Sequence, residues 1–111
     1  MSQDGSFRAE VEKLNDDQFG NKVTKIKCHG KLVNSTVNEM KAQVQPLLPL
    51  GGRIELDLSD LNYMDSSGLG ALVGLKVSAI RQGLCILEFV NMTPRVLELL
   101  RLTHLTQLFS S

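Results

Sequence analysis

Apolar and polar residues alternate in three segments of the chain, at 7–12, 24–29 and 54–59. Strict alternation is the pattern of a strand that buries one face, so each segment is predicted to form a strand. Residues 15–21, between the first two segments, are rich in asparagine, aspartate and glycine, which favours a turn and therefore a β-hairpin. Gly30 is expected to end the second strand.

The next apolar positions are three or four residues apart, which predicts an amphipathic helix over 37–48. Thr36 and Glu39 have the spacing of a capping box at its start. Pro46 and Pro49 bracket its end, because proline cannot continue a helix. The apolar stripe of this helix consists of Val37, Met40, Val44, Leu47 and Leu48.

A second helix is predicted from the segment Asp65-Ser-Ser-Gly68 to Gly83, where glycine fits a left-handed helix cap. Asp65 or Ser66 can serve as its amino-terminal cap. Gly70 and Gly74 are four residues apart, and a glycine inside a helix costs about 1 kcal/mol relative to alanine. Their spacing therefore suggests close packing of the helix against a sheet. One helical face carries Leu69, Leu72, Val73 and Ile80.

The remaining segments predict one more strand and one more helix. The nearly continuous apolar run 84–90 is typical of an interior strand that is buried on both faces. Thr93 and Pro94 favour the start of a helix that extends to about Leu102. Leu105, Leu108 and Phe109 could supply a last short strand or simply pack.

The order of these elements predicts an α/β fold with a mixed sheet, parallel strands joined by helices, and an opening antiparallel hairpin. A chain of 111 residues is expected to form a single domain over 1–111. The predicted core includes Leu56, Leu58, Leu72, Val73, Ile86 and Phe89.

Charge and composition exclude several classes of function. Twelve basic residues balance twelve acidic ones, so no nucleic-acid partner is expected. The longest apolar stretch, 68–75, is far shorter than the roughly 20 residues that span a bilayer, so no membrane insertion is expected. Cys28 and Cys85 lie in separate strand segments without metal ligands at suitable spacing, which argues for buried thiols in a reducing cytoplasm and against a metal site.

Two catalytic patterns fail on inspection. Gly68 and Gly70 begin a dinucleotide fingerprint, but Val73 stands where the third glycine is required. Ser66 lacks the Gly-x-Ser-x-Gly elbow of a hydrolase, and His29 is expected on an exposed strand face instead of in a triad. The sequence therefore predicts no cofactor, no metal and no catalytic residue.

The segment from Leu56 to Gly70, Leu-Asp-Leu-Ser-Asp-Leu-Asn-Tyr-Met-Asp-Ser-Ser-Gly-Leu-Gly, closely resembles the signature of the STAS domain of bacterial anti-sigma-factor antagonists. Residues 30–36 and 91–105 resemble the first strand-to-helix turn and the last loop and helix of that family. The resemblance implies a STAS-like fold for the whole chain. It also implies that Ser66, the first serine after the aspartate, is phosphorylated by a partner kinase.

In that family, the unphosphorylated antagonist binds a serine-kinase anti-sigma factor and so frees a sigma factor, and a serine phosphatase resets the switch. The resemblance thus makes this chain a ligand and a substrate, not an enzyme, and the kinase brings ATP and Mg²⁺. The start of a helix also tolerates phosphate well, because its N–H groups are unpaired and its dipole is positive there. The implied contact residues are Ser35, Thr36, Met64, Asp65, Ser66, Ser67, Gly68 and Leu69.

Two features depart from the family pattern. Val33 stands where many members carry an aspartate, and the chain ends at Ser111, so that the usual carboxyl-terminal strand and tail are shortened. Three alternatives stay open on the sequence alone. Asp65-Ser-Ser could be a simple helix cap; the chain could be an unphosphorylated STAS subunit or scaffold of a transporter or stress-signalling complex; or it could be a small enzyme or nucleotide-binding domain.

Overall fold

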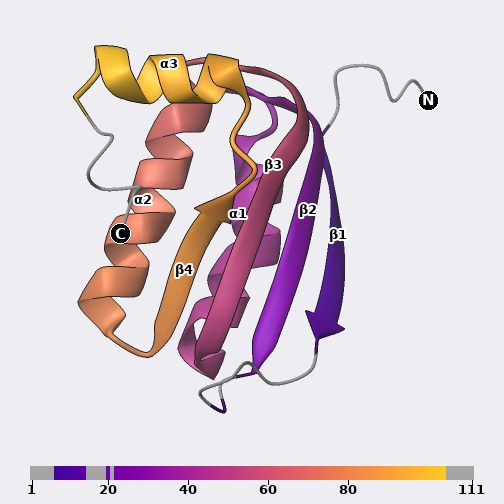
Figure 1. The fold of residues 1–111 in the computed structure, drawn as a ribbon, viewed down its shortest axis with the longest axis vertical. Helices are drawn as coiled ribbons and strands as arrows, with labels where there is room; N and C mark the ends of the chain where they lie inside the picture. The colour runs from indigo at the N-terminus through magenta and orange to yellow at the C-terminus, as the bar shows by residue number, and fades with distance from the viewer. Residues whose placement is uncertain (1–6, 15–19, 21, 105–111) are drawn as a thin grey trace.

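The computed structural model describes residues 7–14, 20 and 22–104, and its strands and helices follow the order expected from the sequence (Figure 1). The predicted α/β fold is confirmed. The possible last strand from Leu105, Leu108 and Phe109 lies outside the described residues. The elements are β1 (Phe7–Leu14), β2 (Val23–Leu32), α1 (Val37–Val44), the 3₁₀ helix η1 (Gln45–Leu50), β3 (Gly52–Met64), α2 (Ser66–Gln82), β4 (Cys85–Val90) and α3 (Pro94–Leu102).

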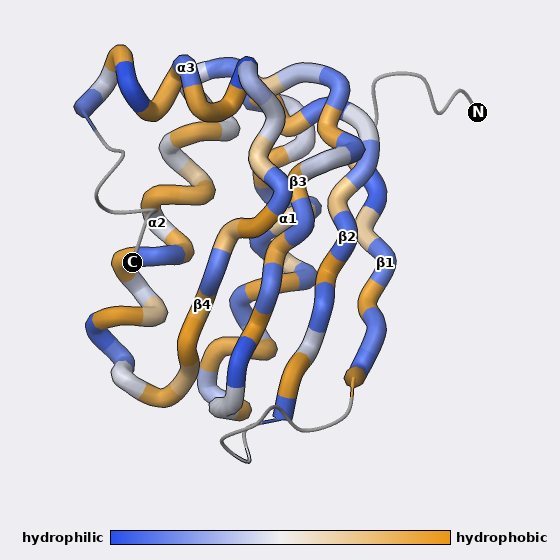
Figure 2. Tube along the Cα trace, in the orientation of Figure 1, coloured by the Kyte–Doolittle hydropathy of each residue, from blue (hydrophilic) through white to orange (hydrophobic). Residues whose placement is uncertain are grey.

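The strands form one mixed sheet in the order β1-β2-β3-β4. β1 pairs antiparallel with β2, as the predicted hairpin requires, whereas β2, β3 and β4 are parallel. Helices α1 and α2 cover one face of this sheet, and α3 lies across the end where the parallel strands finish (Figure 1). No helix of the described residues covers the opposite face, and the hydropathy accordingly alternates along the strands (Figure 2).

Within the described residues, β4 is the last strand of the sheet and only one of its faces is covered, so the prediction of an interior strand buried on both faces is wrong. Leu87 and Phe89 are buried under α2, but Ile86 points to the open face and is 50% exposed. Buried and more exposed positions alternate along β4 as in other strands. The sequence does not show this alternation, because outward positions such as Ile86 are apolar too. Ile86 must therefore be removed from the predicted core.

The buried face of α2 is rotated relative to the prediction. Leu72, Leu75 and Ala79 form its buried stripe, at i, i+3 and i+7. Val73 and Ile80 each lie one residue further along the helix, a turn of about 100°. Consequently Val73 is only half-buried and Ile80 is 59% exposed. The other predicted core residues, Leu56, Leu58 and Phe89, are buried as expected.

The first helix has the predicted stripe but not the predicted cap. Met40, Val44 and Leu48 are buried, and the helix tightens into η1 where the prolines begin. The Thr36 hydroxyl accepts a hydrogen bond from the Val33 N–H (2.9 Å) and donates one to the Lys31 carbonyl (2.8 Å). It therefore braces the turn before α1 and takes no part in a capping box.

Gly30 does not end β2. It lies inside the strand with φ of 92°. The pairing of β2 with β3 shifts register just before His29 and again just after Gly30. A glycine is suited to such a bulge because it adopts positive φ without a steric penalty. The shifts let both strands continue to Leu32 and Met64, where the candidate site begins.

Candidate functional site

Strands β2 and β3 end side by side, with Leu32 paired to Met64, and the chain leaves this edge in two loops. One loop, 33–36, leads into α1, and the other is Asp65 at the start of α2. The two groups of predicted contact residues, which are separated by about thirty positions in the sequence, therefore meet at the carboxyl edge of the parallel strands. This edge is where ligands and partners commonly bind in α/β sheets.

Asp65 connects the two loops. One of its carboxylate oxygens, Oδ1, accepts a hydrogen bond from the Gly68 N–H (2.9 Å) and so caps α2. The other, Oδ2, accepts one from the Asn34 N–H (3.4 Å), and the Asp65 N–H donates to the Leu32 carbonyl (3.3 Å). The structure thus selects Asp65 over Ser66 as the cap. Asn34 carries no sequence signal for this role, because its contribution is a backbone group that any residue but proline would have.

Ser66 is the first residue of α2 and its side chain is exposed, whereas Ser67 is half-buried. Within the described part of the chain, the Ser66 hydroxyl has no hydrogen-bond partner, because Asp65 already caps the helix. Ser35 is also exposed, on the neighbouring loop. The geometry therefore leaves the Ser66 hydroxyl unengaged and exposed at the start of α2, where it is more accessible than that of Ser67.

Four of the predicted contact residues support this edge from inside the molecule. Thr36, Met64, Gly68 and Leu69 are all buried. A Cβ at Gly68 would collide with the Leu32 carbonyl oxygen and would lie 2.7 Å from Cγ of Met64. Of the predicted contact residues, only Ser35, Asp65, Ser66 and Ser67 reach the surface.

Close packing requires a glycine at position 68, and not at positions 70 and 74 as the spacing suggested. A Cβ at Gly70 or at Gly74 would meet no atom within 4 Å. The prediction that these two glycines allow α2 to approach the sheet is therefore wrong. Both are on the exposed side of the helix.

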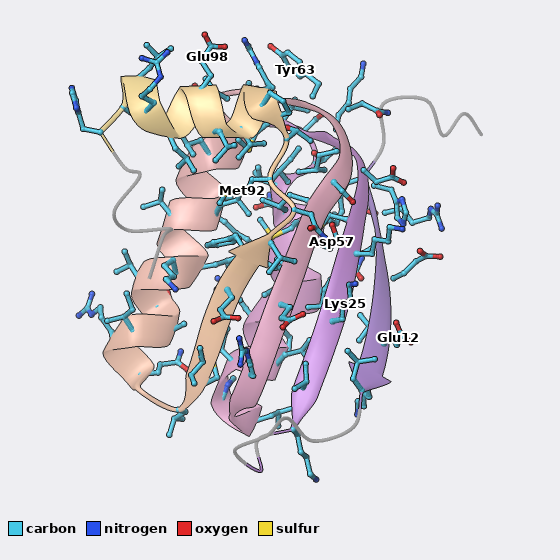
Figure 3. The ribbon with its side chains drawn as sticks, in the orientation of Figure 1. Glu12, Lys25, Asp57, Tyr63, Met92 and Glu98 are labelled. Carbon is cyan, nitrogen blue, oxygen red and sulfur yellow. The ribbon has the colours of Figure 1, made fainter. Side chains whose placement is uncertain are left out.

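A buried carboxylate lies at the end of the β3–β4 pairing. Asp57 is almost fully buried, its Oδ1 accepts a hydrogen bond from the Ser59 N–H (2.9 Å), and its Oδ2 lies 3.8 Å from Nζ of Lys25 (Figure 3). Burial raises the pKa of Asp57, but hydrogen bonds from Ser59 and Asn91 and the charge of Lys25 outweigh burial and lower the pKa below its usual value. The side chain of Asp57 is therefore ionised near neutral pH in spite of its burial.

His29 lies on the open face of the sheet, as expected, but it is held between two carboxylates and its side chain is only 15% exposed. Its Nδ1 is 2.5 Å from Oδ2 of Asp60, and its Nε2 is 2.8 Å from Oε1 of Glu10. A neutral imidazole has one N–H, so both contacts are hydrogen bonds only when the ring carries both protons. The cluster thus joins β1, β2 and β3 beside the register shifts.

This geometry predicts a pH-dependent contribution of Glu10 to stability. The hydrogen bond and charge of His29, with Arg8 and Lys27 nearby, lower the pKa of Glu10 below 4.5. The Glu10 carboxylate therefore stabilises the fold fully above its unfolded pKa, and this contribution is lost as the pH falls through the folded value.

We expect the loss of stability in Glu10→Gln to be larger at about pH 7 than at about pH 3, because the carboxylate that pairs with His29 loses its charge as the pH falls through its folded pKa. Urea denaturation of the variant and the wild type at both pH values measures it. Glu12→Gln, at an exposed position of the same strand, serves as the control. An equal loss at both pH values in Glu10→Gln would show that the charge of Glu10 does not stabilise the fold.

The two thiols are not poised for chemistry. Burial raises the pKa of Cys28 to about 12, and burial also raises the pKa of Cys85 in spite of the nearby charge of Lys76. Both are therefore protonated near neutral pH. In the described ranges, no three histidine, cysteine or acidic side chains are grouped as metal ligands would be. Over the same residues, none of the helices has the length and apolar character to span a membrane.

Most of the chain matches the model of a known protein family. The family model described as Mlab, STAS domain, matches residues 16–110. The chain belongs to the STAS domain family. The predicted family is thus confirmed over nearly the whole chain, and the loop with Ser66 lies within the matched range.

Curated STAS relatives carry a more specific name. The anti-sigma-B factor antagonist of Staphylococcus aureus is 33% identical over 99 residues, which cover 88% of this chain and 87% of that protein. The anti-sigma factor antagonist SpoIIAA in its unphosphorylated form has a TM-score of 0.68 at 20% identity, covering 90% of this chain and 84% of the other. The phosphorylated form of SpoIIAA from Bacillus has a TM-score of 0.66 at 19% identity, covering 90% and 86%.

The same fold also occurs as one part of a much larger protein. The murine anion transporter Slc26a9 has a TM-score of 0.62 at 19% identity, covering 91% of this chain but only 18% of the transporter. At such identities the structural likeness establishes the STAS fold and no more. The transporter and the antagonists therefore share this fold.

Proposed function

We propose that this STAS protein is an anti-sigma factor antagonist whose unphosphorylated form binds a serine-kinase anti-sigma factor and so releases a sigma factor. The observation that carries the proposal is the exposed Ser66 hydroxyl at the start of α2, left unengaged because Asp65 caps the helix. The names of the curated relatives support the same assignment. In this role the chain is a ligand and a substrate, and the kinase supplies ATP and Mg²⁺.

The site explains how phosphorylation would switch the complex off. A phosphate on Ser66 adds about −1.5 to −2 charges at neutral pH, beside the carboxylate of Asp65. The start of α2 stabilises that charge through its unpaired N–H groups and its dipole, so the free protein tolerates it. A partner surface packed over the same edge would have to desolvate it, which opposes binding. A serine phosphatase then restores the binding form.

Phosphate uptake tests the assignment of the serine. The chain is incubated with the serine-kinase anti-sigma factor encoded nearest to it and with ATP, and the phosphosite is mapped by mass spectrometry. Uptake is expected in the wild type and in Ser67→Ala, and it should be absent in Ser66→Ala. Retained uptake in Ser66→Ala with loss in Ser67→Ala would transfer the site to Ser67.

A second candidate is an unphosphorylated STAS subunit or scaffold, for example in a transporter complex. The occurrence of this fold in the anion transporter Slc26a9 favours it. A scaffold needs the fold but not a modifiable serine at the start of α2. Failure of any cognate kinase to phosphorylate the wild type would support this candidate over the antagonist.

A further inference from the structure

A small cleft lies beside the phosphorylation site, between the end of β3 and the start of α3. Its volume is about 160 Å³, and it is lined by residues 61–64 and 93–96. Sites for drug-sized ligands occupy about 300–1,000 Å³, so this cleft suits a single side chain better than a small molecule. One of its walls continues directly into Asp65 and Ser66.

An aromatic ring and a guanidinium group form the rim of this cleft. The guanidinium carbon of Arg95 is 6.0 Å from the centroid of the Tyr63 ring, within range of a cation–π interaction. Tyr63 is 45% exposed. It is the only tyrosine in the sequence, which contains no tryptophan. It projects from the same end of the molecule as α3 (Figure 3). Tyrosine and arginine are enriched among the residues that dominate binding energy in protein interfaces.

Arg95 gives the cleft a positive charge. Among the described residues that line the cleft, it is the only charged one. Among the described residues, no carboxylate lies within salt-bridge distance of Arg95, whereas Arg8 and Arg53 are paired with Glu10 and Glu88. A guanidinium group is built for bidentate pairing with a carboxylate. The exposed rim therefore complements an acidic side chain of another protein.

We propose that Tyr63 and Arg95 form a second contact of the kinase-docking surface, in which Arg95 pairs with a carboxylate of the anti-sigma factor and the cleft receives the stem of that side chain. This inference rests on the proposed function, because it names a contact of the same partner. Tyr63 precedes Ser66 by three residues, so the surface is continuous with the phosphorylation site. The contact would hold the kinase over Ser66 without touching the transferred phosphate.

Calorimetric titration with the nearest encoded serine-kinase anti-sigma factor tests the inference. Arg95→Ala and Tyr63→Ala should each weaken binding of the unphosphorylated chain about ten-fold, and Arg95→Glu should weaken it further because it repels a carboxylate. The matched control is Arg101→Ala, an exposed arginine in the last turn of the same helix, which should change affinity by less than about two-fold. Unchanged thermal midpoints exclude a folding defect.

The kinetics of phosphorylation separate docking from chemistry. With Arg95→Ala, the KM for the chain should rise while kcat stays the same, since Arg95 contacts neither ATP nor Ser66 in this scheme. If Arg95→Glu bound the kinase with wild-type affinity and the kinase still phosphorylated Ser66, the inference would be overturned and the proposed function would stand. If the Arg95 variants lost affinity for the kinase only when Ser66 is phosphorylated, Arg95 would act on the phosphate, and the inference would also be overturned. Absence of any kinase binding in the wild type would overturn both.

Discussion

Leu72→Ala is expected to lower the free energy of unfolding by about 2–5 kcal/mol, as truncation of a buried leucine does when a cavity remains. Leu72 is 0% exposed and belongs to the buried stripe of α2. Because this helix begins with Ser66, its packing against the sheet also fixes the position of the candidate site. Urea denaturation followed by circular dichroism measures the loss.

Ile80→Ala on the same helix is the matched control. Its side chain faces solvent, so the substitution should change stability by no more than about 0.5 kcal/mol. A loss in Ile80→Ala as large as that in Leu72→Ala would mean that α2 is rotated toward the face that carries Val73 and Ile80. The pair of variants thus tests the orientation of the helix as well as the depth of the core.

Gly68→Ala and Gly74→Ala are expected to change stability in opposite directions. At Gly68 the added methyl group meets a backbone carbonyl that is itself fixed by the Asp65 N–H, so overpacking should cost about 1–3 kcal/mol or more. At Gly74 the methyl group meets nothing, and the helical propensity of alanine should stabilise the protein by up to about 1 kcal/mol.

Denaturation midpoints of the two glycine variants give the comparison directly. Since both substitutions add one methyl group to the same helix, the difference between them reports the local space alone. A stable Gly68→Ala would show that α2 can move away from β2 without cost. A destabilised Gly74→Ala would restore the idea that the Gly70 and Gly74 spacing serves close packing.

The order of elements and the site motif were predictable from local patterns. Apolar and polar residues alternate in 54–59, and an apolar stripe runs through Met40 and Val44. Each pattern lies within one element that buries one face, so it can be read from that segment alone. The ends of α2 were equally readable, since Asp65 and Gly83 cap it through local hydrogen bonds and a positive φ. Such features need no knowledge of which strands become neighbours.

The features that the sequence analysis predicted wrongly or missed depend on how strands and helices lie relative to one another. Ile86 is exposed because no helix of the described residues covers the open face of the sheet, and no local pattern shows which face stays open. The partners of His29 come from β1 and β3, so they depend on the register of two strand pairs. Likewise, the tight contact at Gly68 exists only because β2 ends against the start of α2.

The central claim is that phosphate on Ser66 dissociates this protein from its kinase. The direct measurement is the affinity of the anti-sigma factor for the chain before and after stoichiometric phosphorylation, with phosphorylated Ser67→Ala as a control for the site. A switch with a coupling of about 1–3 kcal/mol predicts binding about 5–150-fold weaker for the phosphorylated chain. Equal affinity of the two forms would contradict the account.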